Sequence, residues 1–143
     1  MSGLIHAHSG LRYVVLALLL FAIFKAFTAK SNYTEGTRKL NLFTLIATHT
    51  QILIGFALYF MSEKVTFNSE TMGSSFLRFF AVEHIFGMVL ATVLITVGHS
   101  KSKKAETPEA KNKKIALFYT IALVLILASI PWPFREALGG KWF

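Results

Sequence analysis

Residues 79–88 read Phe-Phe-Ala-Val-Glu-His-Ile-Phe-Gly-Met, and they open an apolar segment that extends to Gly98. Glu83 and His84 stand side by side in this stretch, where the chain is already apolar enough to enter lipid. Ionisable side chains are costly inside a membrane, so they normally face the interior of a helix bundle and have a partner there. The stretch therefore predicts a membrane-spanning helix with a polar, inward-facing site.

The composition of the whole chain agrees with a membrane domain. The 143 residues are 54% hydrophobic, and the mean hydropathy is +0.55. A hydrocarbon core of ~30 Å needs ~20 helical residues for each crossing, and four apolar runs come near that length. The sequence predicts one domain over residues 1–143, an all-α, membrane-embedded, antiparallel four-helix bundle with short connections. The predicted helices cover residues 11–29, 40–61, 79–98 and 115–130.

The basic residues are distributed unevenly between the two predicted sides of the membrane. The side that holds the connections near residues 30–39 and 99–114 carries ten Lys and Arg, and the other side carries five. The ten are Lys25, Lys30, Arg38, Lys39, Lys101, Lys103, Lys104, Lys111, Lys113 and Lys114. Because cytoplasmic loops carry the excess of positive charge, both termini are predicted to face away from the cytoplasm.

The net charge of +8 has a simpler explanation than nucleic-acid binding. The charged residues lie between the apolar runs, where they set topology, so the predicted partner is the lipid bilayer and no nucleic acid. The chain has no Cys, which excludes disulfides and thiolate metal sites. It also has no nucleophile-and-base motif and no phosphate-binding glycine loop, which argues against hydrolase and NTPase chemistry.

Four of the histidines can be ordered by their predicted depth, because a helix rises ~1.5 Å per residue. His8 and His84 are expected at similar depth, near the outer ends of the first and third helices. His49 lies in the middle of the second helix, roughly two turns deeper. His99 lies at the opposite end, about 15 Å from His49 in depth, so these two make a poor pair. One site is predicted rather than two.

One b-type haem is the cofactor that this arrangement favours, because imidazoles from facing helices commonly hold haem iron in a bundle. His84 is the predicted first axial ligand. His8 is favoured as the second ligand because its predicted depth matches that of His84. His49 is favoured because it lies within a helix and not near a chain terminus that can fray. Gly87 shares a helix face with His84 and would let a flat macrocycle approach the backbone.

Charged residues near the same end have predicted roles in binding the haem. Arg12 follows His8 by four residues and lies on the same helix face. Together with Arg78 and Arg135 it would form an outer cluster that receives the two propionates through bidentate pairs. Glu83 would accept a hydrogen bond from a ligating imidazole, or would pair with Arg78.

Two other interpretations of these residues stay open. The histidines could hold a transition-metal ion such as copper, zinc or iron, all of which imidazole suits. That metal site would use His8, His49 and His84, with Glu83. Alternatively, the histidines only join helices through hydrogen bonds in a small structural or assembly subunit. Such interhelical bonding is also the predicted role of Thr44, Thr48 and Gln51.

Four segments of the chain carry a resemblance to a known family. They are His-Ser-Gly-Leu-Arg-Tyr (8–13), Leu-Ile-Ala-Thr-His-Thr-Gln (45–51), Arg-Phe-Phe-Ala-Val-Glu-His (78–84) and Ile-Pro-Trp-Pro (130–133). The chain resembles the small four-helix, cytochrome b-like integral membrane proteins of Bacteroidota, over nearly its whole length. The resemblance implies a membrane bundle and haem b. By matching motif it implies a role for His8, His49 and His84, and none for His6 or His99.

The function expected from these observations is electron transfer in the inner membrane. The chain would act as a carrier or as a subunit rather than as a stand-alone enzyme. Quinol or a respiratory membrane complex is the expected partner.

Overall fold

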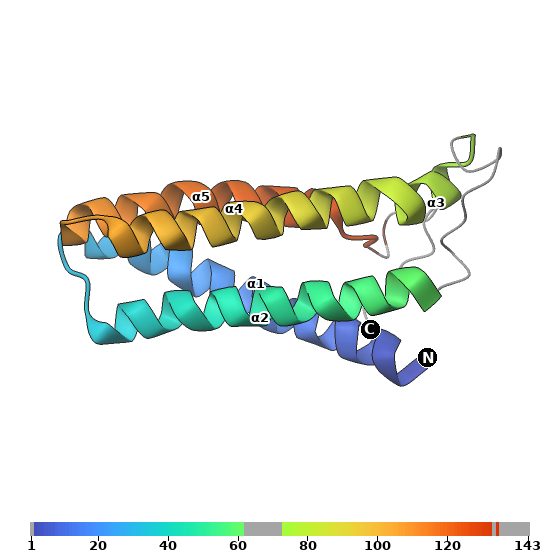
Figure 1. The fold of residues 1–143 in the computed structure, drawn as a ribbon, viewed down its shortest axis with the longest axis horizontal. Coiled ribbons are helices and arrows are strands. Elements are labelled where there is room, and N and C mark those ends of the chain that lie inside the picture. Colours follow the sequence, from blue (N-terminus) through green and yellow to red (C-terminus); the bar gives the residue numbers. More distant parts are fainter. Residues whose placement is uncertain (1, 62–72, 133, 135–143) are drawn as a thin grey trace.

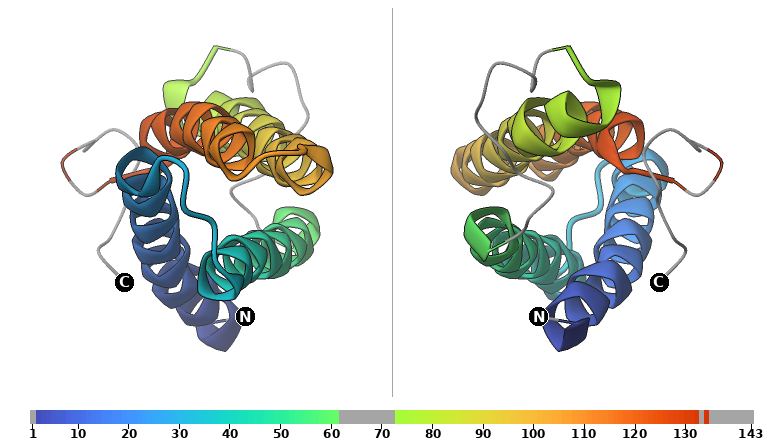
Figure 2. Two further views of the ribbon diagram at one scale, coloured as in Figure 1. Left: turned by 90° about the vertical axis from the view of Figure 1, so that its left-hand side faces the viewer. Right: turned by 90° about the vertical axis from the view of Figure 1, so that its right-hand side faces the viewer.

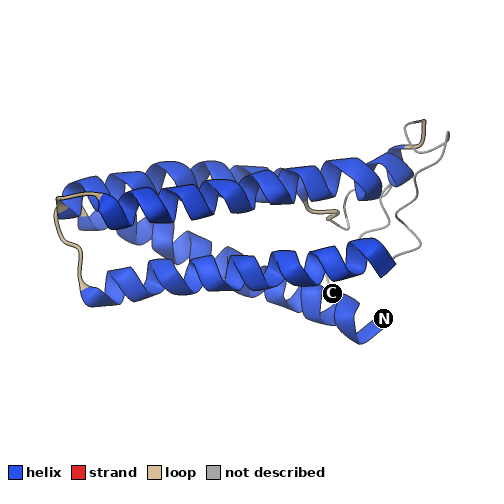
Figure 3. Ribbon diagram, in the orientation of Figure 1, coloured by secondary structure: helices blue, strands red, loops and turns tan. Residues whose placement is uncertain are grey.

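The computed structural model describes residues 2–61, 73–132 and 134, and within them every regular element is a helix (Figures 1 and 3). The all-α prediction is confirmed. Helix α3, the π-helical turn η1 and helix α4 follow one another without a break. The elements are α1 (Ser2–Ala29), α2 (Glu35–Met61), α3 (Ser75–Arg78), η1 (Phe79–Glu83), α4 (His84–Lys104) and α5 (Pro108–Ser129).

Four helical spans in the described residues are long and apolar enough to cross a membrane, and their lengths run from 22 to 29 residues. At a rise of ~1.5 Å, even 22 residues reach about 33 Å, which exceeds the hydrocarbon core of ~30 Å. Large apolar side chains remain exposed along these helices, as a bilayer-facing surface requires. Examples are Phe21, Phe24, Phe60, Phe86 and Val124. The chain is therefore a multi-pass membrane protein.

The four long helices form a ring in which each packs against two neighbours (Figure 2). Helix α1 packs against α2 and α5, and α4 packs against the same two helices. The α1–α2 connection (30–34) and the α4–α5 connection (105–107) lie at one end of the bundle, called the lysine end below (Figure 1). The N-terminus and α3 lie at the other end, called the histidine end.

The helices extend further than the apolar runs predict. The stretch 99–114, predicted to be a solvated loop, is helical except at 105–107. The reason is a helix-start signal that apolarity does not measure. The Thr107 hydroxyl accepts a hydrogen bond from the Ala110 N–H at 3.1 Å, and Pro108 occupies the first turn. Thr at the cap and Pro at the first helical position are both strongly preferred at helix starts.

Apolar packing is densest between α4 and α5. Gly98 makes the close approach possible, because a Cβ added there would overlap the Phe118 side chain, 2.9 Å from its Cγ. Ile95 of α4 and Ile115 and Tyr119 of α5 are fully buried.

Buried polar side chains cross-link the helices toward the lysine end. The Tyr119 hydroxyl of α5 donates to the Asn41 carbonyl of α2 at 3.1 Å. Asn112 is 2% exposed, and its amide donates to the carbonyls of Lys30 and Asn32 at 2.8 and 3.1 Å. The Asn112 bonds fix the start of α5 against the α1–α2 connection, and the Tyr119 bond joins α5 to α2.

Candidate functional site

His8 of α1 and His84 of α4 meet at the histidine end of the bundle. Their ring centres lie 6.4 Å apart, and the ring planes make an angle of 76°. Both side chains are half-buried. The prediction that these two histidines lie at the same depth is confirmed.

A π-helical turn precedes His84 and sets its position. The His84 N–H donates to the Phe79 carbonyl five residues back, which widens this turn relative to the α-helix. The Tyr59 hydroxyl of α2 donates to the Ala81 carbonyl within the turn at 2.7 Å. Single π-helical turns inside helices occur frequently at functional sites. The apolar run predicts a helix here, but it does not predict the π-helical turn.

An ion pair bridges the same turn. Arg78 Nε donates to Glu83 Oε1 at 2.9 Å. Of the two predicted roles of Glu83, the structure therefore shows the pairing with Arg78.

The hydrogen bond of His84 fixes its tautomer. Its Nδ1 lies 2.7 Å from the Ser129 carbonyl oxygen at the end of α5. Because a carbonyl oxygen only accepts, Nδ1 must carry the proton, which leaves a free lone pair on Nε2. Metal-ligating histidines characteristically have this arrangement, with one nitrogen held by a carbonyl and the other available for the metal.

The position of Ser129 also explains why residue 87 is a glycine. A Cβ added at Gly87 would overlap the Ser129 hydroxyl and would lie 3.0 Å from the Ser129 Cβ. Gly87 is buried for this reason and lets α5 approach α4. The structure places α5 over Gly87, where the sequence predicted a flat macrocycle.

Helix α2 supports His8 from the side. The Gln51 amide donates to the His8 carbonyl at 2.7 Å, so the interhelical role predicted for Gln51 is confirmed. One turn further on, a Cβ added at Gly55 would stand 3.3 Å from His8 Cε1. His8 Nδ1 is buried and has no hydrogen-bond partner among the described residues. Buried polar atoms normally have a partner, so this nitrogen has unused capacity to bind one.

His49 does not join this pair. Its Nε2 lies 2.8 Å from the Thr96 hydroxyl, and Thr96 is twelve residues beyond His84 on α4. That spacing corresponds to about 18 Å along the helix, more than the predicted two turns.

The tautomer of His49 follows from a second hydrogen bond, which the Thr96 hydroxyl makes. The Thr96 hydroxyl donates its only proton to the Thr92 carbonyl at 2.7 Å. It must therefore accept from His49, whose Nε2 carries the proton and is not free to bind a metal. Because Thr96 also lies one turn from His99, the predicted 15 Å offset in depth between His49 and His99 is wrong.

Arg12 lies among aromatic side chains near His8. Its guanidinium stands 4.8 Å from the ring centre of Tyr13 and 5.5 Å from that of Trp132, and Nη2 donates to the Tyr13 hydroxyl at 3.2 Å. Such cation–π contacts can hold an arginine side chain at a membrane interface. Arg135, predicted to join the same cluster, lies outside the described residues.

Within the described parts of the chain, no group of three or more His, Cys, Asp or Glu side chains is placed to hold a metal ion. No protein-family model, curated protein or solved structure matches the chain. The geometry of the His8–His84 pair is therefore the basis for inferring its function.

Sequence reasoning missed two residues that shape the site, Gly55 and Ser129. Gly55 follows Gln51 by four residues, so both lie on one helix face, and this spacing was a usable signal. Ser129 ends α5 shortly before Pro131. The last carbonyls of a helix have no partner within it, and one of them was available to a neighbouring imidazole.

Proposed function

We propose that this chain is a membrane electron-transfer protein that holds one b-type haem between His8 and His84. The ring-centre separation of 6.4 Å carries the proposal. A metal–imidazole bond measures ~2.0–2.1 Å, so two imidazoles on opposite sides of one ion have ring centres about 6 Å apart. The Nε2 of His84 and the Nδ1 of His8 have no hydrogen-bond partner among the described residues, so they add two nitrogens with unused capacity.

The number of ligands favours haem over a bare ion. A structural or catalytic zinc ion takes three or four protein ligands, whereas the site supplies two imidazoles. Haem iron needs only axial ligands, because the macrocycle provides the rest, and it would supply one-electron chemistry. The Ser129 carbonyl would keep the His84 ring in its ligating tautomer. Arg12, four residues from His8, would neutralise a propionate.

The proposal includes an orientation and a partner. The four helices would run antiparallel, with both termini on the outer face of a bacterial inner membrane. The concentration of basic residues at the lysine end supports this orientation, because such residues stay in the cytoplasm. The haem would then lie near the outer face, where quinol or a respiratory complex could exchange electrons with it.

Absorption spectroscopy of a set of histidine variants tests the proposal. The proteins are expressed with ample haem and purified in detergent. His84→Ala and His8→Ala are expected to lose the Soret band, because each removes an axial ligand. His6→Ala and His49→Ala are the matched controls and should keep it. A Soret band that survives in His84→Ala would contradict the proposal.

A second function, that of a structural subunit, is favoured by one observation. The bonds from His84 to Ser129 and from His49 to Thr96 each join two helices. If this bonding were their whole role, both histidine-to-alanine variants would lower stability by a similar amount, about 0.6 kcal/mol for an interhelical bond in a membrane. Neither variant would then have a spectroscopic effect.

A further inference from the structure

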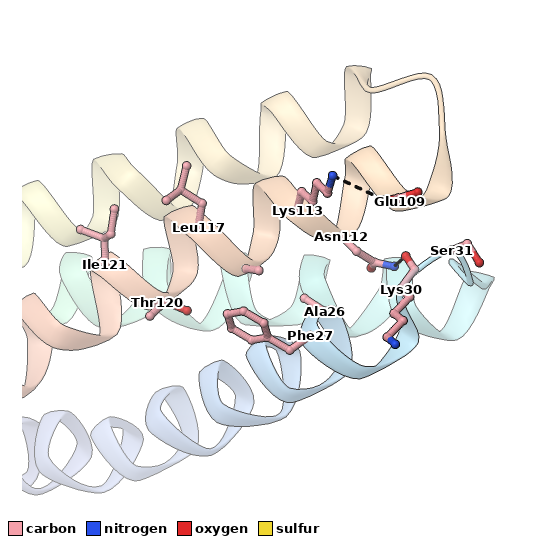
Figure 4. Close-up of a pocket in the computed structure, with 11 residues that line it drawn as sticks. Ala26, Phe27, Lys30, Ser31, Glu109, Asn112, Lys113, Leu117, Thr120 and Ile121 are labelled. Atoms are coloured by element: carbon pink, nitrogen blue, oxygen red, sulfur yellow. Dashed lines mark hydrogen bonds and ion pairs between the residues drawn. The ribbon is translucent and has the colours of Figure 1, made fainter.

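We propose that an anionic phospholipid binds in a groove between α1 and α5 at the lysine end, with its phosphate between Lys30 and Lys113. The groove has a volume of about 740 Å³ (Figure 4). It is remote from the histidine pair, so this inference does not depend on the proposed haem, although it shares the proposed orientation, in which the lysine end faces the cytoplasm.

The groove has the polarity of a lipid. Lys30, Lys113 and Glu109 lie at its polar end, close to the helix connections (Figure 4). Leu117 and Ile121 continue along α5 from Lys113, and Ile121 lies eight residues beyond it. At a rise of ~1.5 Å per residue, the apolar wall extends about 12 Å toward the middle of the membrane. A lipid headgroup would match the charged end of the groove, and the first part of an acyl chain would match the apolar wall.

The two lysines are held in place by the backbone. The buried Asn112, next to Lys113, donates to the Lys30 carbonyl at 2.8 Å. This bond ties the end of α1 to the second turn of α5, so the backbones of the two lysines stay close together, although their side chains point in different directions in Figure 4. Lys30 also has a positive φ of 50°, a conformation in which glycine is the usual residue after a helix. A lysine at this position supplies a cation that glycine would not.

The charges at the mouth favour an anion. Glu109 is the acidic residue in the groove wall, and it pairs with Lys113 at 3.4 Å. Both side chains of this ion pair are largely exposed, so the pair contributes little free energy. Lys113 can therefore leave Glu109 and bind a phosphate instead. Basic pockets between membrane helices on the cytoplasmic side are typical sites for anionic headgroups.

Native mass spectrometry of the full chain in detergent tests this proposal. The protein is incubated with equal amounts of phosphatidylglycerol and phosphatidylcholine that have the same acyl chains. The wild type should retain one phosphatidylglycerol with about fivefold preference, because the two lysines and the opposing Glu109 leave a net charge of +1 near the headgroup. The double variant Lys30→Gln, Lys113→Gln should bring that preference close to one.

Two further variants make the result specific to the groove. Lys101→Gln with Lys104→Gln removes the same charge from α4 at the same end and should keep the wild-type preference. Leu117→Trp fills the apolar wall without changing charge and should abolish retention of either lipid. Leu117 is 53% exposed, so this variant leaves the core intact, which circular dichroism can check.

Several results would overturn the proposal. One is equal retention of the two lipids by the wild type. Another is an equal loss of preference in both double-lysine variants, which would assign the effect to general surface charge. Unchanged retention in Leu117→Trp, or a second copy of the chain in place of lipid, would exclude the groove as the binding site.

Discussion

Gly98→Ala tests how closely α4 and α5 pack. The added Cβ would overlap the Phe118 side chain, with 2.9 Å to Phe118 Cγ and an even closer approach to Phe118 Cβ. The Phe118 Cβ is attached directly to the backbone, so a side-chain rotation cannot relieve the overlap and the two helices must separate. Overpacking of this kind costs about 1–3 kcal/mol. The ~1 kcal/mol gain in helix propensity offsets little, because membrane helices stay largely formed in the unfolded state.

The assay is reversible unfolding in mixed micelles, in which SDS is titrated against a mild detergent and near-UV circular dichroism is followed. Gly98→Ala should lower the free energy of unfolding by about 2 kcal/mol. Gly3→Ala is the matched control, because a Cβ there meets nothing within 4 Å, and it should leave the stability unchanged. If Gly98→Ala were as stable as the wild type, the close α4–α5 packing described above would be refuted.

Two other substitutions probe the lysine end. Thr107→Ala removes the N-cap of α5 and should cost about 1 kcal/mol. Hydrogen exchange at the Ala110 amide should become faster, and an unchanged rate would show that the cap contributes nothing. Asn112→Leu removes two hydrogen bonds between α5 and the α1–α2 connection and should cost about 2 kcal/mol, at ~1 kcal/mol for each bond. A loss below 0.5 kcal/mol in the SDS titration would mean that the connection is held by other contacts.

The number and identity of the long helices could be predicted because the thickness of the bilayer fixes the length of each apolar run. Their ends could not be predicted from apolarity, since α4 and α5 continue as polar helices beyond the apolar runs. The helix start at Thr107–Pro108 was visible in the sequence as a cap and a first-turn proline. The run of lysines on both sides of it nevertheless predicts a solvated loop.

The candidate site was predictable where it depends only on how far a residue lies from the outer end of its apolar run. The similar depth of His8 and His84 follows from the helix rise per residue. The position of His49 depends on how far α2 slides along α4, which side-chain packing decides. Its partner Thr96 therefore could not be predicted. The π-helical turn before His84 likewise arises from contacts with other elements, such as the bond from Tyr59 to Ala81.

The haem content of the wild-type protein tests the central claim most directly. The full chain is expressed with ample haem and purified, and haem is quantified against protein by its absorption spectrum in pyridine. The His8–His84 geometry predicts one haem per chain, with a reduced spectrum typical of low-spin, bis-imidazole iron. Protein that folds in detergent and contains no haem would contradict the account and leave the histidines with a structural role.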